Sequence, residues 1–199
     1  MKSRTDAKKI GLLCVLGLGL LVGQGLQARA QQPQSVARED SLTKATEYYY
    51  QAVLARSADQ PHSAYQLLRH AHALAPEDGD IAYLLGRVAA DLGREAESLP
   101  LLELAYRVDS SRREYGQALA SAYFSRERLQ DALRITEQLA KADPDNDDMR
   151  YRLVQLYARS GDLKKAIELC GELQERFKRN VDAYGQVTQM KIQLQRMAG

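Results

Sequence analysis

The hydrophobic and polar positions after residue 30 nowhere alternate strictly enough to predict a β-strand. Near the C-terminus, Val187, Met190, Leu194 and Met197 follow one another at intervals of three, four and three, which marks one face of an α-helix. Alanine, leucine, glutamate, arginine and glutamine dominate this part of the chain, and these residues favour helix over sheet. The pattern therefore predicts an all-α protein.

A longer period of 34 residues runs through the same region. Small residues form one column of this period, and leucines or other apolar residues form several more. The columns are Ala64, Ser98, Ala132 and Ala166; Tyr65, Leu99, Leu133 and Ile167; Leu67, Leu101, Ile135 and Leu169; and Leu85, Leu119 and Leu153. Gly93 and Gly161 lie two periods apart, as do Pro76 and Pro144. The chain is therefore expected to repeat one structural unit about four times.

Each unit is interpreted as two antiparallel helices joined by a short turn. Small residues such as Ala64 let the second helix approach the first closely. Gly93 and Gly161 are suited to a left-handed turn after the first helix, and Pro76 and Pro144 to the start of the next unit. Because no unit can bury its apolar stripe alone, the units must stack on one another.

These columns resemble the tetratricopeptide repeat, of exported bacterial type. The expected repeats span 45–78, 79–112, 113–146 and 147–180, within a repeat region of 41–180. The residues that carry the resemblance are Tyr48, Ala52, Ala64, Leu68, Ala71 and Pro76 in the first repeat; Leu85, Gly86, Gly93, Ser98, Leu102 and Ala105 in the second; Leu119, Ala120, Tyr123, Ala132 and Pro144 in the third; and Leu153, Tyr157, Gly161 and Ala166 in the fourth. Gln51 departs from the family pattern, and the second repeat lacks a closing proline. The resemblance implies a right-handed α-solenoid of about four units.

Both ends of this solenoid need a cap or a connection. Residues 181–199 are predicted to form a C-terminal capping helix over the fourth repeat, with an uncovered partner-binding helix as the alternative. Residues 31–40 are polar and unpatterned, which is typical of a flexible linker. Asp40 or Ser41 is expected to cap the first helix.

Residues 1–30 have the pattern of a secretory signal peptide. A basic stretch from Lys2 to Lys9 precedes uncharged residues 10–26, and Ala28-Arg29-Ala30 is a small-x-small cleavage signal. The alternative is an uncleaved inner-membrane anchor, since the 17 uncharged residues approach the length of a membrane span. Either interpretation predicts that residues 31–199 are exported to the periplasm or cell envelope.

Removal of the leader changes the charge of the chain. The formal net charge is +2, but residues 1–30 hold five of the 28 basic residues and one of the 26 acidic ones. The remaining 23 basic and 25 acidic residues give about −2, so bulk charge offers no basis for nucleic-acid binding. Cys170 is then the single cysteine, and it is interpreted as a small buried residue on a helix.

The sequence offers no catalytic or cofactor motif: it lacks a nucleophile elbow, a phosphate loop, a zinc-protease motif and a dinucleotide fingerprint. His70 and His72 are two residues apart, and helical geometry separates them too widely to share one metal ion with His62. The acidic run 143–148 begins like a calcium loop but has Asp148 and Val154 where glycine and glutamate are needed. We therefore expect no enzyme activity, no cofactor and no metal.

By resemblance to the family, one set of columns on the first helices faces a concave groove. Tyrosine and arginine in such columns provide large contact areas and directed hydrogen bonds. The candidate groove residues are Tyr49, Val53, Arg56, Tyr83, Arg87, Ser121, Phe124, Tyr151, Gln155 and Arg159, with Asp91 and Gln117 beside them. The alternative is that the tyrosines only complete the packing between helices. The groove positions contain no lysine or asparagine, so a carboxylate clamp of the family's known type is not expected.

The sequence thus predicts a non-enzymatic exported scaffold that binds a segment of another protein in its concave groove. Assembly of an envelope complex for secretion, pilus formation or polysaccharide export is the setting suggested by analogy. The alternative is a structural spacer or a homo-oligomerisation module that uses the convex face or the C-terminal helix. The identity of the partner, the pathway and the oligomeric state are not encoded in any recognisable motif.

Overall fold

The computed structural model describes residues 37–199, and all its regular elements are helices. The first described helix occupies residues 37–57. It is followed by α2 (Pro61–Leu74), α3 (Gly79–Asp91), α4 (Glu95–Val108), α5 (Arg113–Ser125), α6 (Leu129–Ala142), α7 (Asp147–Ser160), α8 (Leu163–Phe177) and α9 (Val181–Ala198). The prediction of an all-α protein is confirmed.

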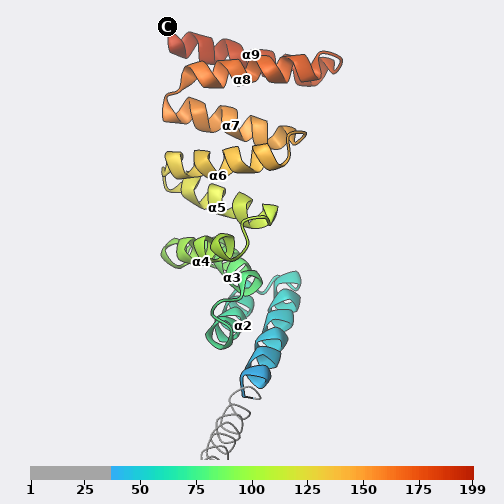
Figure 1. Ribbon diagram of the computed structural model, residues 1–199, viewed down its shortest axis with the longest axis vertical. Coiled ribbons are helices and arrows are strands. Elements are labelled where there is room, and N and C mark those ends of the chain that lie inside the picture. The colour runs from blue at the N-terminus through green and yellow to red at the C-terminus, as the bar shows by residue number, and fades with distance from the viewer. Residues whose placement is uncertain (1–36) are drawn as a thin grey trace, which may run out of the picture.

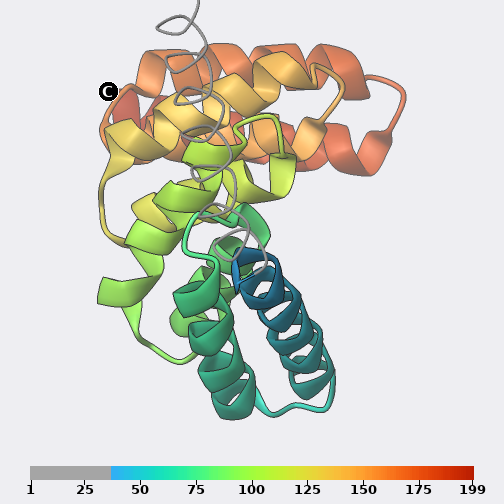
Figure 2. The same ribbon diagram turned by 60° about the horizontal axis from the view of Figure 1, so that its bottom comes forward.

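The helices pack as antiparallel neighbours in chain order and form an elongated stack (Figure 1). The helix of residues 37–57 lies at one end of this stack, and α9 lies at the other. Figure 2 shows that the first helices run across the direction of the last ones, so the stack turns along its length. This architecture is the right-handed α-solenoid of about four helix pairs, closed by a capping helix, that the sequence predicts.

The 34-residue columns form the core between the helices. The small residues Ala64, Ser98, Ala132 and Ala166 are all almost completely buried. Gly86 shows why some of these positions must be small: a Cβ atom added there would lie 3.0 Å from Cγ of Leu102 and 3.2 Å from Cβ of Leu101. α3 and α4 can therefore approach each other only because residue 86 has no side chain.

The turn inside each helix pair uses the same backbone conformation four times. Asp59, Gly93, Glu127 and Gly161 have φ angles of 56°, 70°, 58° and 87°, and they are spaced 34 residues apart. Glycine adopts this left-handed conformation without steric cost, whereas aspartate and glutamate do so at a cost. The left-handed turn thus belongs to every repeating unit. The backbone is least strained in the two units that have glycine at this position, Gly93 and Gly161.

Side-chain caps fix the starts of α3, α7 and α9, whereas α5 has no side-chain cap. Asp78, Asn146 and Asn180 accept hydrogen bonds from the backbone N–H groups of Ile81, Met149 and Ala183, at 3.0, 3.2 and 3.2 Å. Such a cap satisfies one of the amide donors that the first helical turn leaves unpaired.

Three expectations for the chain ends differ from the structure or lie beyond it. Residues 37–40 are already helical, so Asp40 and Ser41 lie inside the first helix and do not cap it; the Ser41 hydroxyl donates to the Ala37 carbonyl instead. Met197 is 66% exposed and does not share the buried face of Val187 and Leu194. The flexible linker predicted for residues 31–40 is helical at 37–40, and residues 31–36 and the predicted signal peptide lie outside the described residues.

Candidate functional site

Three neighbouring hollows run along the first helices of successive pairs. The first, of about 410 Å³, lies between α3 and α5; the second, of about 150 Å³, between α5 and α7; and the third, of about 400 Å³, between α7 and α9. Ser121 lines both the first and the second hollow, while Arg152 and Gln155 line both the second and the third. Because shared residues join each hollow to the next, the three make one groove, which we call the α3–α9 groove.

Tyr83 and Arg87 form one wall of the first hollow. The Tyr83 ring packs 5.0 Å from the ring of Tyr115, whose hydroxyl donates to Asp80 at 2.8 Å. Burial and this hydrogen bond to Asp80 raise the pKa of Tyr115, so its hydroxyl stays a donor at neutral pH. Arg87 in turn donates to the Tyr83 hydroxyl at 3.2 Å. The aromatic wall is therefore held in place from two sides.

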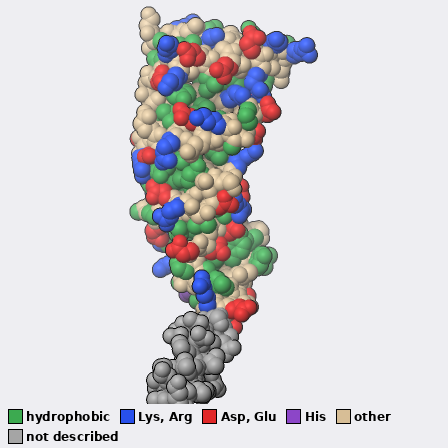
Figure 3. Space-filling model, viewed as in Figure 1, with side chains coloured by type: hydrophobic (Ala, Val, Ile, Leu, Met, Phe, Trp, Pro, Cys, Tyr) green, Lys and Arg blue, Asp and Glu red, His purple; other side chains and the backbone are tan. Residues whose placement is uncertain are grey.

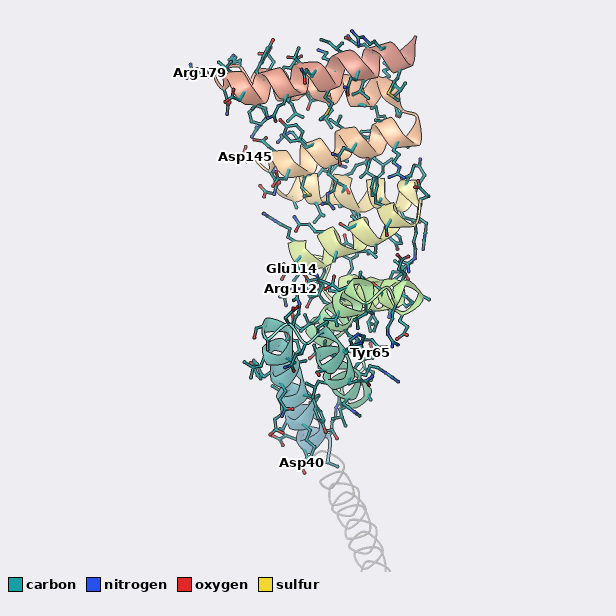
Figure 4. All side chains as sticks on the ribbon, turned by 180° about the vertical axis from the view of Figure 1, so that it is seen from behind. Asp40, Tyr65, Arg112, Glu114, Asp145 and Arg179 are labelled. Atoms are coloured by element: carbon teal, nitrogen blue, oxygen red, sulfur yellow. The ribbon has the colours of Figure 1, made fainter. Side chains whose placement is uncertain are left out.

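Glu114 lies across the first hollow at the start of α5. Arg112 donates two hydrogen bonds to its carboxylate, at 2.7 and 2.9 Å, and a third to Asp80 at 2.7 Å (Figure 4). A hydrogen bond from its own backbone amide, together with Arg112, holds the pKa of Glu114 below its ordinary value. Glu114 is therefore an ionised acceptor with a fixed orientation.

The second hollow is spanned by a contact between α5 and α7. Arg152 donates to the Ser121 hydroxyl at 2.7 Å, and that hydroxyl donates to the Gln117 carbonyl at 2.9 Å. Phe124 closes the hollow, and the guanidinium of Arg159 lies 4.6 Å from the centre of its ring. A cation above an aromatic face stabilises the ring's position, so Phe124 presents a defined apolar surface.

The third hollow lies at the C-terminal end of the groove. Tyr151 stacks on Phe177 of α8, with 6.1 Å between ring centres. Burial is the main cause that raises the pKa of Tyr151, followed by the nearby Asp147. Gln186 and Met190 of α9 complete the lining, so the capping helix also forms part of the groove.

The lining of the groove is chemically mixed. Its charged lining residues are two arginines, Arg87 and Arg152, and three carboxylates, Asp91, Glu114 and Asp148. Amide and hydroxyl groups of Gln117, Ser121 and Gln155 lie between them. Figure 3 shows basic and acidic side chains similarly intermixed over the visible face. Within residues 37–199 no three His, Cys, Asp or Glu side chains gather as they would around a metal ion.

Cys170 and His72 lie away from the groove. Cys170 is completely buried on α8, as expected for a small core residue, and burial raises the pKa of its thiol. His72 is half-buried, and the loss of solvent lowers its pKa. In the described part of the chain, no helix is both long and apolar enough to span a membrane.

The structure places six of the ten candidate residues in the groove: Tyr83, Arg87, Ser121, Phe124, Tyr151 and Gln155. The other four, Tyr49, Val53, Arg56 and Arg159, line none of the three hollows. Tyr49 is half-buried between the first helix pair and α3, where it packs against two core clusters. Arg159 pairs with Glu127 and covers Phe124 from outside.

Several groove residues were not among the candidates. Glu114, Ala118, Ala122 and Ser125 continue the α5 stripe of Gln117 and Ser121 at steps of three and four. Arg152 and Gln186 occupy the same 34-residue column as Ala118. The sequence contains both the steps of three and four residues on α5 and the 34-residue column of Ala118. To find these residues, the groove-facing positions must be followed along each helix as well as from one repeat to the next.

Helix pairs of constant length that stack through small-residue columns and leave a groove along their first helices define a helical-repeat protein. The family model of the tetratricopeptide repeat matches residues 123–189. The match shows that the chain contains tetratricopeptide repeats, and the fold and the repeated columns continue the same pattern over the other helix pairs. None of the curated proteins matches it in sequence.

Solved structures with the same fold are distant in sequence. YrrB, a tetratricopeptide repeat protein with an unusual peptide-binding site, is 18% identical and aligns with a TM-score of 0.63 over 80% of this chain and 87% of its own. MamA is 19% identical, with a TM-score of 0.62 over 77% of this chain and 87% of its own. The first repeat domain of Spaghetti (RPAP3), solved with an HSP90 peptide, is 15% identical, with a TM-score of 0.53 over 58% of this chain and 91% of its own. At these identities the likeness shows the fold.

Proposed function

We propose that this protein is a non-enzymatic scaffold that binds an extended segment of another protein in the α3–α9 groove. The observation that carries the proposal is the continuity of three hollows through the shared residues Ser121, Arg152 and Gln155. A continuous groove lets one ligand contact several units at once, so that weak contacts add along its length.

The lining of the groove is suited to a peptide in extended conformation. Gln117, Ser121 and Gln155 offer both hydrogen-bond donors and acceptors, which match the alternating N–H and C=O groups of a peptide backbone. Tyr83, Phe124 and Tyr151 supply apolar surfaces for side chains along the peptide. Arg87 and Arg152 would then select acidic groups at fixed positions.

Two of the structures with this fold support peptide binding as its use. YrrB has a peptide-binding site, and the first repeat domain of Spaghetti (RPAP3) holds an HSP90 peptide. The groove residues described above give this chain the surface that such a use requires.

The proposed place of action is outside the cytoplasm, in the periplasm or cell envelope. The support comes from the sequence of residues 1–30, with its basic start, uncharged core and Ala28-Arg29-Ala30 cleavage signal. In that setting the bound segment belongs to an envelope complex, such as one for secretion, pilus assembly or polysaccharide export.

The experiment is a selection of random linear peptides displayed on phage against the purified chain, followed by calorimetric titration of the enriched peptides. The variants Tyr83→Ala and Arg152→Ala are each expected to raise Kd at least about tenfold, because they remove an aromatic surface and a groove cation. The matched control is Arg134→Ala on α6, an exposed arginine that lines none of the hollows.

Equal affinity of the wild type and both groove variants would overturn the proposal, because the peptide would then bind elsewhere. Loss of binding in the Arg134 control with retention in the groove variants would place the site on the other helices of the pairs.

A further inference from the structure

Exposed apolar side chains concentrate at the two ends of the solenoid. Of nine large hydrophobic side chains exposed in residues 37–199, four lie on the helix of residues 37–57 and four on α9. The four on the first helix are Leu42, Tyr50, Val53 and Leu54; the four on α9 are Val181, Tyr184, Ile192 and Met197; the ninth is Val108. In Figure 3 the hydrophobic side chains at the lower right lie over the first of these helices.

Three of the α9 residues share one face. At about 100° per residue, Val181, Tyr184 and Ile192 fall within an arc of roughly 80° that also contains Thr188. Val181 is 84% exposed, and Tyr184 and Ile192 are each 42% exposed. We call Val181, Tyr184, Thr188 and Ile192 the outer stripe of α9. Val187 and Leu194, on another side of the helix, pack on α8. Thr188 is half-buried and accepts a hydrogen bond from the Gln174 amide of α8 at 2.8 Å, and Lys191 donates to the Gln174 carbonyl at 2.9 Å, so the edge of the stripe next to α8 is held in place.

The outer stripe is arranged to pair with a second copy of itself. If two α9 helices lie antiparallel with Thr188 at the two-fold axis, Tyr184 of each falls level with Ile192 of the other. It then meets the depression between Thr188, Lys191, Ile192 and Gln195, which have the i, i+3, i+4, i+7 spacing of a knob-into-hole contact.

The charges beside the stripe fit the same register. Asp182 and Arg196 are both exposed, on the side of the stripe away from Lys191, and neither forms an ion pair within residues 37–199. In the antiparallel pair, Asp182 of one helix lies within one turn of Arg196 of the other, on the same side of the axis. The two-fold symmetry makes this contact twice.

The exposed stripe of the first helix lacks this complementarity. The acids Asp40 and Glu47 lie on the same flank of that stripe, so an antiparallel pair of these helices would bring like charges together.

We propose that the protein forms a symmetric homodimer in which the outer stripes of two α9 helices pack antiparallel, held in register by Asp182–Arg196 ion pairs. One pair of helices about 27 Å long gives an interface at the small end of the range for specific complexes, so we expect a Kd of about 10 μM. The α3–α9 groove uses Gln186 and Met190, which are not in the outer stripe. A dimer would therefore present two grooves.

The test is sedimentation velocity of the full chain from about 1 to 100 μM. The wild type is expected to shift from monomer to dimer across this range, and Tyr184→Asp and Ile192→Asp are expected to remain monomers with unchanged circular dichroism. Met197→Asp is the matched control, because Met197 is exposed on the same helix but lies off the stripe.

Charge reversal tests the register. Asp182→Arg and Arg196→Asp are each expected to raise the dimer Kd about tenfold, since two symmetric attractions become repulsions, and the double variant is expected to restore the wild-type value. A wild type that stays monomeric throughout, a dimer insensitive to the stripe variants, or a double variant no better than either single one would overturn the proposal. Loss of the dimer in Leu54→Asp alone would assign dimerisation to the first helix instead.

Discussion

At the scale of single residues, Tyr123 and Tyr157 show how the repeat is tied together. They occupy the same column, and each donates to a glutamate of the preceding helix pair, Glu103 at 2.9 Å and Glu137 at 2.5 Å. Burial first, and these hydrogen bonds second, raise the pKa of both tyrosines to about 12. Each of these two contacts thus helps to fix the orientation of one helix pair on the next.

These two tyrosines predict a loss of stability in alkali. Their pKa values in the folded chain lie above the ordinary value of 10, so the folded state holds their protons more tightly than the unfolded state does. Their contribution is complete below pH 10 and decreases as the pH rises toward 12. Urea unfolding at successive pH values should show this fall, and the double variant Tyr123→Phe/Tyr157→Phe should show a shallower one. An equally steep fall in the variant would contradict the assignment.

Gly161 supports a second residue-scale prediction. Its φ of 87° is a conformation that alanine adopts only with strain, so Gly161→Ala should lower the free energy of unfolding by about 1 kcal/mol. Gly171→Ala, inside α8 where an added Cβ meets nothing closer than the Lys191 amine at 3.6 Å, should instead raise it by up to about 1 kcal/mol. Denaturant titration measures both. Changes of the same sign would contradict the proposed role of the turn.

At the scale of elements, the contact between α3 and α4 depends on the absence of a side chain. Leucine atoms of α4 lie 3.0 to 3.2 Å from the position of a Cβ on Gly86. Gly86→Val should therefore lower the free energy of unfolding by about 2 kcal/mol through overpacking. Thermal unfolding followed by circular dichroism measures the effect, and an unchanged midpoint would show that the two helices separate without cost.

The sequence predicts the elements well where a column repeats and poorly where it does not. The columns of Ala64 and Leu85 report packing inside the stack, which every unit must satisfy, so the fold class follows from them. Asp40 and Ser41 have no counterpart in a repeated column. Because both are common capping residues, the sequence predicts a helix start at this point, whereas residues 37–40 are already helical.

The same limit applies to the candidate groove. Tyr49 shares a column with Tyr83, yet it packs against Ala71 and Ile81 at the end of the stack and lines no hollow. A column specifies a position on a helix, whereas a hollow needs two such helices side by side with space between them. The sequence therefore predicts which side of the first helices faces the groove, but not where along the solenoid the groove begins and ends.

At the scale of the whole molecule, the last three helix pairs and α9 each contribute one short segment to a surface that none of them has alone. The groove passes from α3 to α9 through Ser121, Arg152 and Gln155. The outer stripe of α9 faces away from it. One solenoid would thus present a peptide site along its length and a self-association site at its end.

The measurement that tests the central proposal most directly is photo-crosslinking from the groove in cells that express the chain. p-Benzoylphenylalanine placed at Gln155, where the second and third hollows join, should crosslink one partner protein through a defined peptide, identified by mass spectrometry. The same residue placed at Lys141 on α6, an exposed position that lines no hollow, should not. The same partner recovered equally from position 141, or only a second copy of this chain recovered from position 155, would contradict a groove that binds a segment of another protein.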